Sequence, residues 1–189
     1  MTGLPGDDAP PVVVDYDPTW PARFEAIRAR IAPHLGPLAV SIEHVGSTSV
    51  PGLAAKPVID IDVVVADASA IPAAIDVLTG LGYEHLGELA VPGREAFRRP
   101  PGTEKHNLYV CPAGSEGLRN HLALRNHLRT HPEAAEAYGA LKRRLAAEVP
   151  DIDAYVVAKT DLIVAFLRAE GIDEETLASI ERANTSPMA

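Results

Sequence analysis

The stretch EHVGSTSVPGLAAKPVIDIDVVV, residues 43–65, decides the fold because it joins a strong strand pattern to two carboxylates. Residues 57–65 are rich in β-branched side chains, and Pro57 stands at the start, where a missing backbone N–H is tolerated. Asp60 and Asp62 interrupt this run two positions apart, so a strand would project both from one face, between Val58 and Val64, and Ile59, Ile61, Val63 and Val65 from the other. Burying carboxylates among valines costs several kcal/mol per charge unless something compensates them.

A divalent cation is one way to compensate the two aspartates. Carboxylates this close repel each other, and paired hard oxygen ligands suit Mg²⁺ (or Mn²⁺), which also binds substrate phosphate oxygens. The alternative is an edge strand with one solvated face, in which D-x-D is only polar alternation.

The turn before the strand favours the cation-site interpretation over the solvated edge strand. Gly46, Ser47, Thr48 and Ser49 follow a predicted strand, and glycine together with hydroxyls and free N–H groups can cradle a phosphate. A phosphate cradle beside a cation site is what a nucleoside triphosphate bound with Mg²⁺ requires. Lys56, between the turn and D-x-D, is either a point charge for a phosphate or a solvated lysine.

Length and composition fit one soluble globular domain. The chain has 189 residues, 47% of them hydrophobic and 23% charged, and its formal net charge is −9. That charge argues against a nucleic-acid partner, which would call for surplus Lys and Arg. No apolar run is long enough for a membrane span, the N-terminus lacks a secretory pattern, and one cysteine, Cys111, excludes a disulfide framework. We therefore expect a cytoplasmic protein.

Hydrophobic periodicity predicts an α+β domain over residues 12–184, with 1–11 and 185–189 as flexible tails. The predicted strands are 12–16, 39–45, 57–65, 83–88, 94–99 and 105–111. The predicted helices run from Asp17 to Gly36, over 70–81, 116–130, 133–148 and 152–170, and from Asp173 onward. The sheet comes first and the C-terminal half is helical, which leaves room for a homodimer face.

The segment 94–131 is basic within an acidic chain. It predicts a local site for a small anion or, alternatively, a solvated basic face. Arg125 and Arg129 are one helical turn apart and predict a clamp for a phosphate or an acidic acceptor. His127 and His131 have a spacing that can bind zinc, but they lack the H-E-x-x-H context.

Residues 42–62 resemble the signature of the GrpB family. The resemblance continues in VDYDPTWPARF (14–24), HNLYV (106–110) and LRNHLRTHP (124–132), and it includes Tyr138, Lys142, Tyr155 and Lys159. This family is similar to the DNA polymerase β-like nucleotidyltransferases, which combine a Gly-Ser turn, D-x-D and a third carboxylate on a neighbouring strand. It also occurs fused to dephospho-CoA kinases. The resemblance implies a mixed β-sheet of the nucleotidyltransferase type.

The resemblance also implies site residues. Gly46, Ser47, Thr48 and Ser49 would hold the triphosphate, and Asp60 and Asp62 would hold Mg²⁺. On the strand 105–111, where the third carboxylate is expected, stand His106, Asn107 and Tyr109, with Glu104 just before as a substitute if the register differs. His106 is then a candidate ligand or general base, since its ordinary pKa lies near neutrality.

Two functions follow as expectations. The first is a Mg²⁺-dependent nucleotidyltransferase that moves a nucleoside monophosphate from a nucleoside triphosphate to an unknown, small-molecule acceptor. The second is a catalytically degenerate module that binds a nucleotide or a CoA-related ligand.

Overall fold

The computed structural model of the protein describes residues 12–89, 91–149 and 152–185. The predicted tail 1–11 lies outside these ranges, and of the predicted tail 185–189 only Thr185 is described, as the last residue of a helix.

A mixed five-stranded sheet forms the centre of the molecule, as the sequence predicts. Its strands are β1 (Ala39–Val45), β2 (Ile59–Val65), β3 (Glu84–Gly87), β4 (Glu95–Arg98) and β5 (His106–Pro112). They lie in the order β1-β2-β5-β4-β3, in which β2 and β5 are parallel and the other neighbours are antiparallel. The strand β2 therefore lies inside the sheet, and the edge-strand interpretation of D-x-D is wrong.

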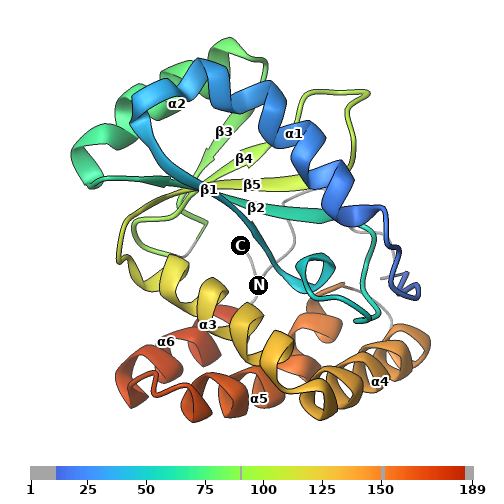
Figure 1. The fold of residues 1–189 in the computed structure, drawn as a ribbon. Helices are drawn as coiled ribbons and strands as arrows, with labels where there is room; N and C mark the ends of the chain where they lie inside the picture. The colour runs from blue at the N-terminus through green and yellow to red at the C-terminus, as the bar shows by residue number, and fades with distance from the viewer. Residues whose placement is uncertain (1–11, 90, 150–151, 186–189) are drawn as a thin grey trace.

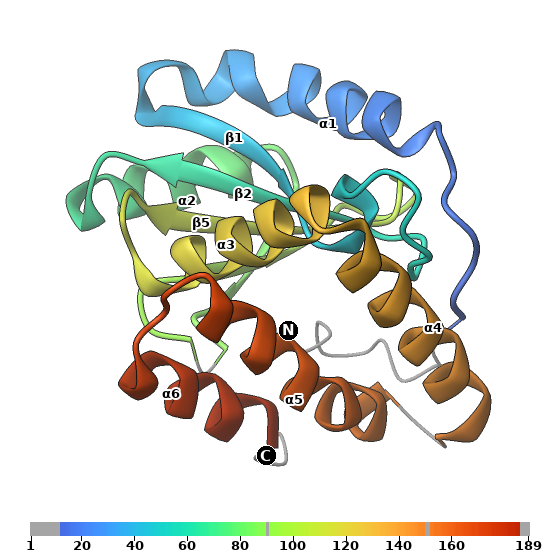
Figure 2. The same cartoon turned by 60° about the horizontal axis from the view of Figure 1, so that its bottom comes forward.

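Helices cover both faces of this sheet. One face is covered by α1 (Trp20–Leu35) and α2 (Ile71–Gly80), and the other faces a group of four helices (Figure 1). That group consists of α3 (Glu116–Thr130), α4 (Pro132–Glu148), α5 (Ile152–Ala169) and α6 (Glu174–Thr185). Figure 2 shows α3 lying between the sheet and α5, so α3 joins the two halves. None of the helices, within the described residues, is long and apolar enough to cross a membrane.

The alternation along β2 assigns its two faces. Ile59, Ile61, Val63 and Val65 are buried in the cores under α1 and α2. Asp60 and Asp62 project from the opposite face, toward the four C-terminal helices, because side chains two apart on a strand share a face. The carboxylates are therefore held between the sheet and the helical half.

The predicted strand 12–16 is shorter than expected. It is reduced to one isolated bridge, in which Val14 and Ala55 exchange two backbone hydrogen bonds of 3.0 Å. Pro57, two residues beyond Ala55, has no N–H with which to extend such a ladder. Short helical turns of the 3₁₀ type, which the sequence did not indicate, occur at Gly36–Leu38, Ser47–Ser49 and Ala68–Ala70.

Replacing Val63 by alanine should test the role of β2 in the core. Val63 is fully buried, so Val63→Ala should lower the free energy of unfolding by about 2 kcal/mol, through lost burial and the cavity left behind. Val40→Ala on β1 is the matched control, because Val40 is 64% exposed and should change stability by less than about 0.5 kcal/mol. Urea unfolding of both variants measures the difference, and equal losses would contradict the assigned core.

Candidate functional site

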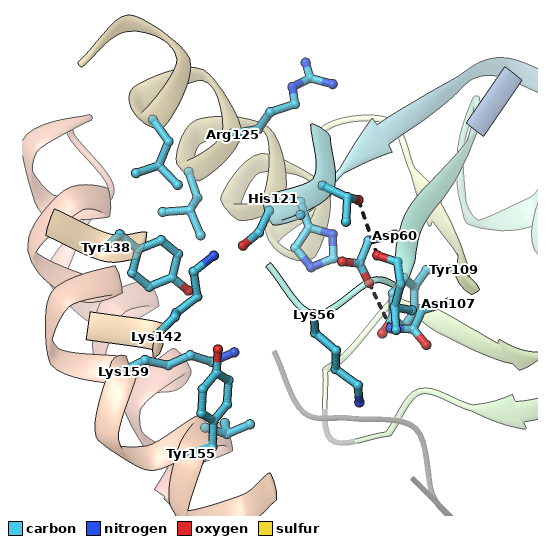
Figure 3. A pocket seen from close by; sticks show the side chains of 17 residues that line it. Lys56, Asp60, Asn107, Tyr109, His121, Arg125, Tyr138, Lys142, Tyr155 and Lys159 are labelled. Carbon is cyan, nitrogen blue, oxygen red and sulfur yellow. Dashed lines mark hydrogen bonds between the residues drawn. The ribbon is translucent and has the colours of Figure 1, made fainter. Parts of the chain in front are cut away.

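A pocket of about 840 Å³, including its open mouth, lies between the D-x-D face of the sheet and the helices α3, α4 and α5. Figure 3 shows side chains entering it from the sheet on one side and from the helices on the other. Its lining comprises Gly46, Ser47, Thr48, Lys56, Val58, Asp60, Asn107, Tyr109, His121, Leu124, Arg125, Leu128, Tyr138, Lys142, Tyr155, Val156 and Lys159.

The two aspartates differ in how they meet the pocket. Asp60 lines it and accepts a hydrogen bond of 2.8 Å from the Asn107 amide, while burial raises the pKa of the Asp60 carboxyl and the Asp62 charge adds to this. Asp62 lies behind it with 0% exposure, and its Oδ2 accepts a hydrogen bond of 2.8 Å from His121 Nδ1. The other oxygen, Asp62 Oδ1, has no hydrogen-bond partner among the described residues. An amide and an imidazole therefore provide part of the compensation that the buried carboxylates require.

Two features require a glycine at position 46: its backbone conformation and its closeness to Asp60. Its φ is +67°, in the region that favours glycine, and a Cβ built there would lie 2.1 Å from Asp60 Oδ2. Any side chain at this position would displace the Asp60 carboxylate. The turn and D-x-D are thus in direct contact across fourteen residues of sequence, as their spacing suggested.

The hydroxyls of Thr48 and Ser49 hold the turn together. Ser49 Oγ donates to the Gly46 carbonyl at 2.6 Å, and Thr48 Oγ1 donates to the Val58 carbonyl at 3.3 Å and lies 3.0 Å from His44 Nε2. Burial, with nearby arginine charges, lowers the pKa of His44 to about 4, so this imidazole is neutral at physiological pH. Of the four turn residues predicted to bind phosphate, Gly46, Ser47 and Thr48 line the pocket, as does the predicted Lys56, whereas Ser49 does not.

Arg125 and Arg129 also support the turn. Arg125 Nη1 donates to Glu43 Oε2 at 2.9 Å and to the His44 carbonyl at 3.1 Å. Arg129 donates twice to the Ser49 carbonyl, from Nε at 3.0 Å and Nη2 at 2.7 Å. Arg125 lies at the pocket wall and points away from Asp60 in Figure 3, and Arg129 is not among the residues lining the pocket. Their contacts in the structure are with protein groups, so the predicted phosphate clamp is replaced by a brace on the turn.

Two of the cations that line the pocket, Lys142 and Lys159, come from α4 and α5. Lys142 is 2% exposed, its ammonium lies 4.5 Å from the centre of the Tyr138 ring, and it makes no hydrogen bond to any described residue. Lys159 lies 4.8 Å from the centre of the Tyr155 ring. Burial lowers the pKa of Lys142 well below its usual value and the pKa of Lys159 to about 8. Both side chains reach toward Asp60 in Figure 3.

Neither lysine is among the predicted site residues, although the sequence carries a pattern that marks both. Tyr138-Lys142 and Tyr155-Lys159 repeat one pattern, a tyrosine followed four residues later by a lysine, on two successive helices. The repetition was a usable signal, because residues four apart share one helix face. His121, which binds Asp62, carried no comparable signal, since its partner lies 59 residues away in the chain.

The assignment of His106 to the site is corrected by the register of β5. In the register of β5 with β2, His106 pairs with Ile59 and Asn107 pairs with Asp60. The side chain of Asn107 therefore projects from the same face of the sheet as Asp60 and Asp62, and that of His106 projects from the opposite face. There His106 lies 2.8 Å from the Tyr83 hydroxyl. Glu104 precedes β5 and binds Arg23 at 3.4 Å, so it does not supply the third carboxylate either. The place expected for that carboxylate holds an amide.

His127 and His131 gain a carboxylate neighbour that the sequence did not reveal. Their ligand atoms and those of Glu170, the residue after α5, lie within 4.8 Å of one another. These groups already form hydrogen bonds with protein atoms. His127 Nδ1 is hydrogen-bonded to Glu170 Oε1 at 2.8 Å, and His131 Nδ1 is hydrogen-bonded to the His127 carbonyl at 3.0 Å. The two rings are also stacked at 4.2 Å. No ion is needed to account for this cluster.

Comparisons with known proteins agree with this description. A family model described as GrpB protein matches residues 10–169. The chain is 39% identical over 159 residues to a UPF0157 protein of Streptomyces coelicolor, covering 83% of this chain and 82% of the relative. It is 33% identical over 152 residues to the UPF0157 protein YqkA of Bacillus subtilis, covering 80% of this chain but 44% of the relative.

A solved structure supports the fold. The crystal structure of the conserved protein GrpB from Enterococcus faecalis matches with a TM-score of 0.74 at 34% identity, covering 88% of this chain and 98% of that one. A dephospho-CoA kinase of Mycolicibacterium paratuberculosis is 29% identical over 177 residues, 80% of this chain and 44% of the kinase. The match to the solved structure confirms the predicted α+β fold class.

Replacing Gly46 by alanine should be penalised twice, by a backbone conformation (φ +67°, ψ −175°) that is essentially restricted to glycine and by the contact with Asp60. Gly46→Ala adds a Cβ in the Asp60 carboxylate, whereas Gly52→Ala, at φ +79°, meets nothing within 4 Å. Gly52→Ala should therefore cost only the backbone term, about 1–2 kcal/mol, and Gly46→Ala should cost clearly more. Thermal or urea unfolding measures both, and equal costs would contradict the special requirement for glycine at position 46.

Proposed function

This chain belongs to the GrpB family, and from that premise we propose that it is a nucleotidyltransferase that uses Mg²⁺ or Mn²⁺. It would move a nucleoside monophosphate from a nucleoside triphosphate to a small-molecule acceptor. The acceptor's nucleophile would attack the α-phosphorus while the bond to the departing pyrophosphate breaks. The family's similarity to polymerase β-like nucleotidyltransferases supports this proposal, as does the contact between Gly46 and Asp60.

One observation carries the proposal: a carboxylate and two ammonium groups face each other across the pocket. Asp60 stands on the sheet side, and the ammonium groups of Lys142 and Lys159 stand on the helix side. A polyphosphate with a bound cation matches both walls, because its oxygens accept hydrogen bonds from lysines while its cation faces the carboxylate. Phosphate oxygens would also give the buried Lys142 ammonium the hydrogen-bond partners that the described residues do not provide.

The donor set suits one divalent ion. Asp60 lines the pocket, and Asp62 keeps one oxygen that is buried and without a partner in the described part of the chain, so these two residues would hold the ion. Asn107 replaces the third carboxylate of the superfamily pattern, which argues for a single ion rather than two. When bound, the ion would neutralise charge on the phosphate oxygens. His106, on the other face of the sheet, has no role in this proposal.

The presence of Asn107, an amide, also favours a second candidate function. With Asn107 in place of the third carboxylate, the pocket also fits a binding module that has lost turnover. The similarity to a dephospho-CoA kinase suggests a CoA-related ligand for such a module. The two candidates differ in one product, because only the transferase releases pyrophosphate.

Thermal unfolding with each of the four ribonucleoside triphosphates, with and without Mg²⁺, tests the proposal. A nucleotide at about a hundred times its Kd should stabilise the protein by about 2.7 kcal/mol, a shift of a few degrees. Asp60→Asn should abolish the Mg²⁺-dependent part, and Lys142→Met should weaken binding of every nucleotide. The matched controls are Asp76→Asn on α2 and Lys105→Met, at exposed positions outside the pocket.

Each outcome decides something. A Mg²⁺-dependent shift, lost in Asp60→Asn and kept in both controls, supports the nucleotide site. A shift that persists in Asp60→Asn contradicts the assigned metal ligand, and no shift with any nucleotide contradicts the site itself. Pyrophosphate release in the presence of candidate acceptors then separates the transferase from the binding module.

The affinity for nucleotide should fall as the pH rises above about 8. Lys159 has a pKa of about 8, and a bound phosphate favours its charged form. Below pH 8 the lysine is already protonated, whereas above pH 8 binding must take up a proton, so affinity should decrease by up to about tenfold per pH unit. Lys159→Gln should bind more weakly at pH 7 and show a flatter profile between pH 7 and 9. Calorimetric titration measures both, and a wild-type profile without this decrease would contradict the role of Lys159.

A further inference from the structure

A second pocket, of about 770 Å³ including its open mouth, lies on the other side of α3 from the first. Two residues of α3, His121 and Leu124, line both pockets and separate them. The second pocket is otherwise bounded by the segment that leads into β4, the first turn of α3, and parts of α5 and α6. Most of its wall is aliphatic and includes Leu89, Val91, Ile163, Leu167 and Ile180.

One buried cation stands in this aliphatic pocket. Arg94 lines it, is 3% exposed, and has its guanidinium 4.5 Å from the centre of the Tyr109 ring. Its Nε and Nη2 atoms are buried and have no hydrogen-bond partner in the described residues. Burying a guanidinium without a hydrogen-bond acceptor costs free energy. A bound ligand that brings an acceptor to Arg94 would recover this cost, because the described residues supply none to these two atoms.

The rest of the pocket limits what that acceptor can be. The guanidinium presents parallel N–H groups that match the two oxygens of a carboxylate. Arg94 is the sole Lys or Arg of this lining, and Glu116 also belongs to it, so a polyanion would be disfavoured. The aliphatic wall would bury an apolar body, and the Asn120 Oδ1, buried and also without a described partner, would accept a hydrogen bond from a hydroxyl or amino substituent on that body.

We propose that this second pocket binds a small carboxylic acid with an apolar body, whose carboxylate is held by Arg94. The proposal goes beyond the nucleotidyltransferase activity and does not depend on it, because neither Arg94 nor Asn120 lines the nucleotide pocket. A ligand bound there would lie next to the nucleotide pocket, with His121 and Leu124 between them.

Calorimetric titration with hexanoate and 3-phenylpropionate, each compared with its neutral amide, tests the proposal in the absence of nucleotide. Wild-type protein should bind at least one of the acids saturably and with a stoichiometry near one. Its amide should bind about tenfold more weakly or worse, because it lacks the charge that Arg94 recognises. Arg94→Met should reduce binding of the acid by about tenfold or more and leave binding of the amide unchanged.

Two further variants make the result decisive. Arg119→Met, on an exposed residue of α3 outside the pocket, is the matched control and should bind the acid as the wild type does. Arg94→Met should fold with unchanged or higher thermal stability, because it removes an unpaired buried charge. If it does not fold, Ser179→Phe, which fills the pocket from α6, should abolish binding instead. Binding that survives in these pocket variants, or no saturable binding of either acid to the wild type, would overturn the proposal.

Discussion

Three side chains spaced one turn apart on α3, His121, Arg125 and Arg129, bind the sheet half to the helical half. His121 donates to the buried Asp62, Arg125 donates to the His44 carbonyl, and Arg129 donates twice to the Ser49 carbonyl. Residues four apart share one face of a helix, so a single stripe of α3 meets β2, the end of β1 and the turn after it. The guanidinium donors of Arg125 and Arg129 make their hydrogen bonds stronger than neutral ones, and the contacts of the three side chains hold the two walls of the pocket in place.

The pocket built around this brace separates opposite charges rather than pairing them. The lysines of α4 and α5 face Asp60 across the pocket, and no salt bridge between these groups occurs among the described residues. Burial without a partner destabilises the charged form of each lysine, which is why the pKa of Lys159 falls to about 8. Such a site is less stable when empty than when an anion is bound, since the anion restores the missing interactions.

The two pockets on either side of α3 differ in the chemistry that each can recognise. The first has several cations, the Asp60 carboxylate and a close backbone turn, which together suit a multiply charged ligand with its counter-ion. The second has one buried guanidinium within an aliphatic wall, which suits a single carboxylate on an apolar body. His121 takes part in both linings while it binds Asp62, so α3 is at once the brace of the fold and the wall between the pockets.

The sequence by itself determined the family, the fold class, nearly every helix and strand, and the contact between the Gly46 turn and D-x-D. Periodicity along the chain carries this information, since alternation assigned both faces of β2 and the 3.6-residue period placed the C-terminal helices. Only the tertiary structure decided which side chains meet. The register of β5 brought Asn107 to Asp60 and turned His106 away, because a shift of one residue reverses the face of every side chain on a strand. The packing of α3 likewise used Arg125 and Arg129 on backbone carbonyls and brought His121 to Asp62, and no local pattern records contacts between residues so far apart in the chain.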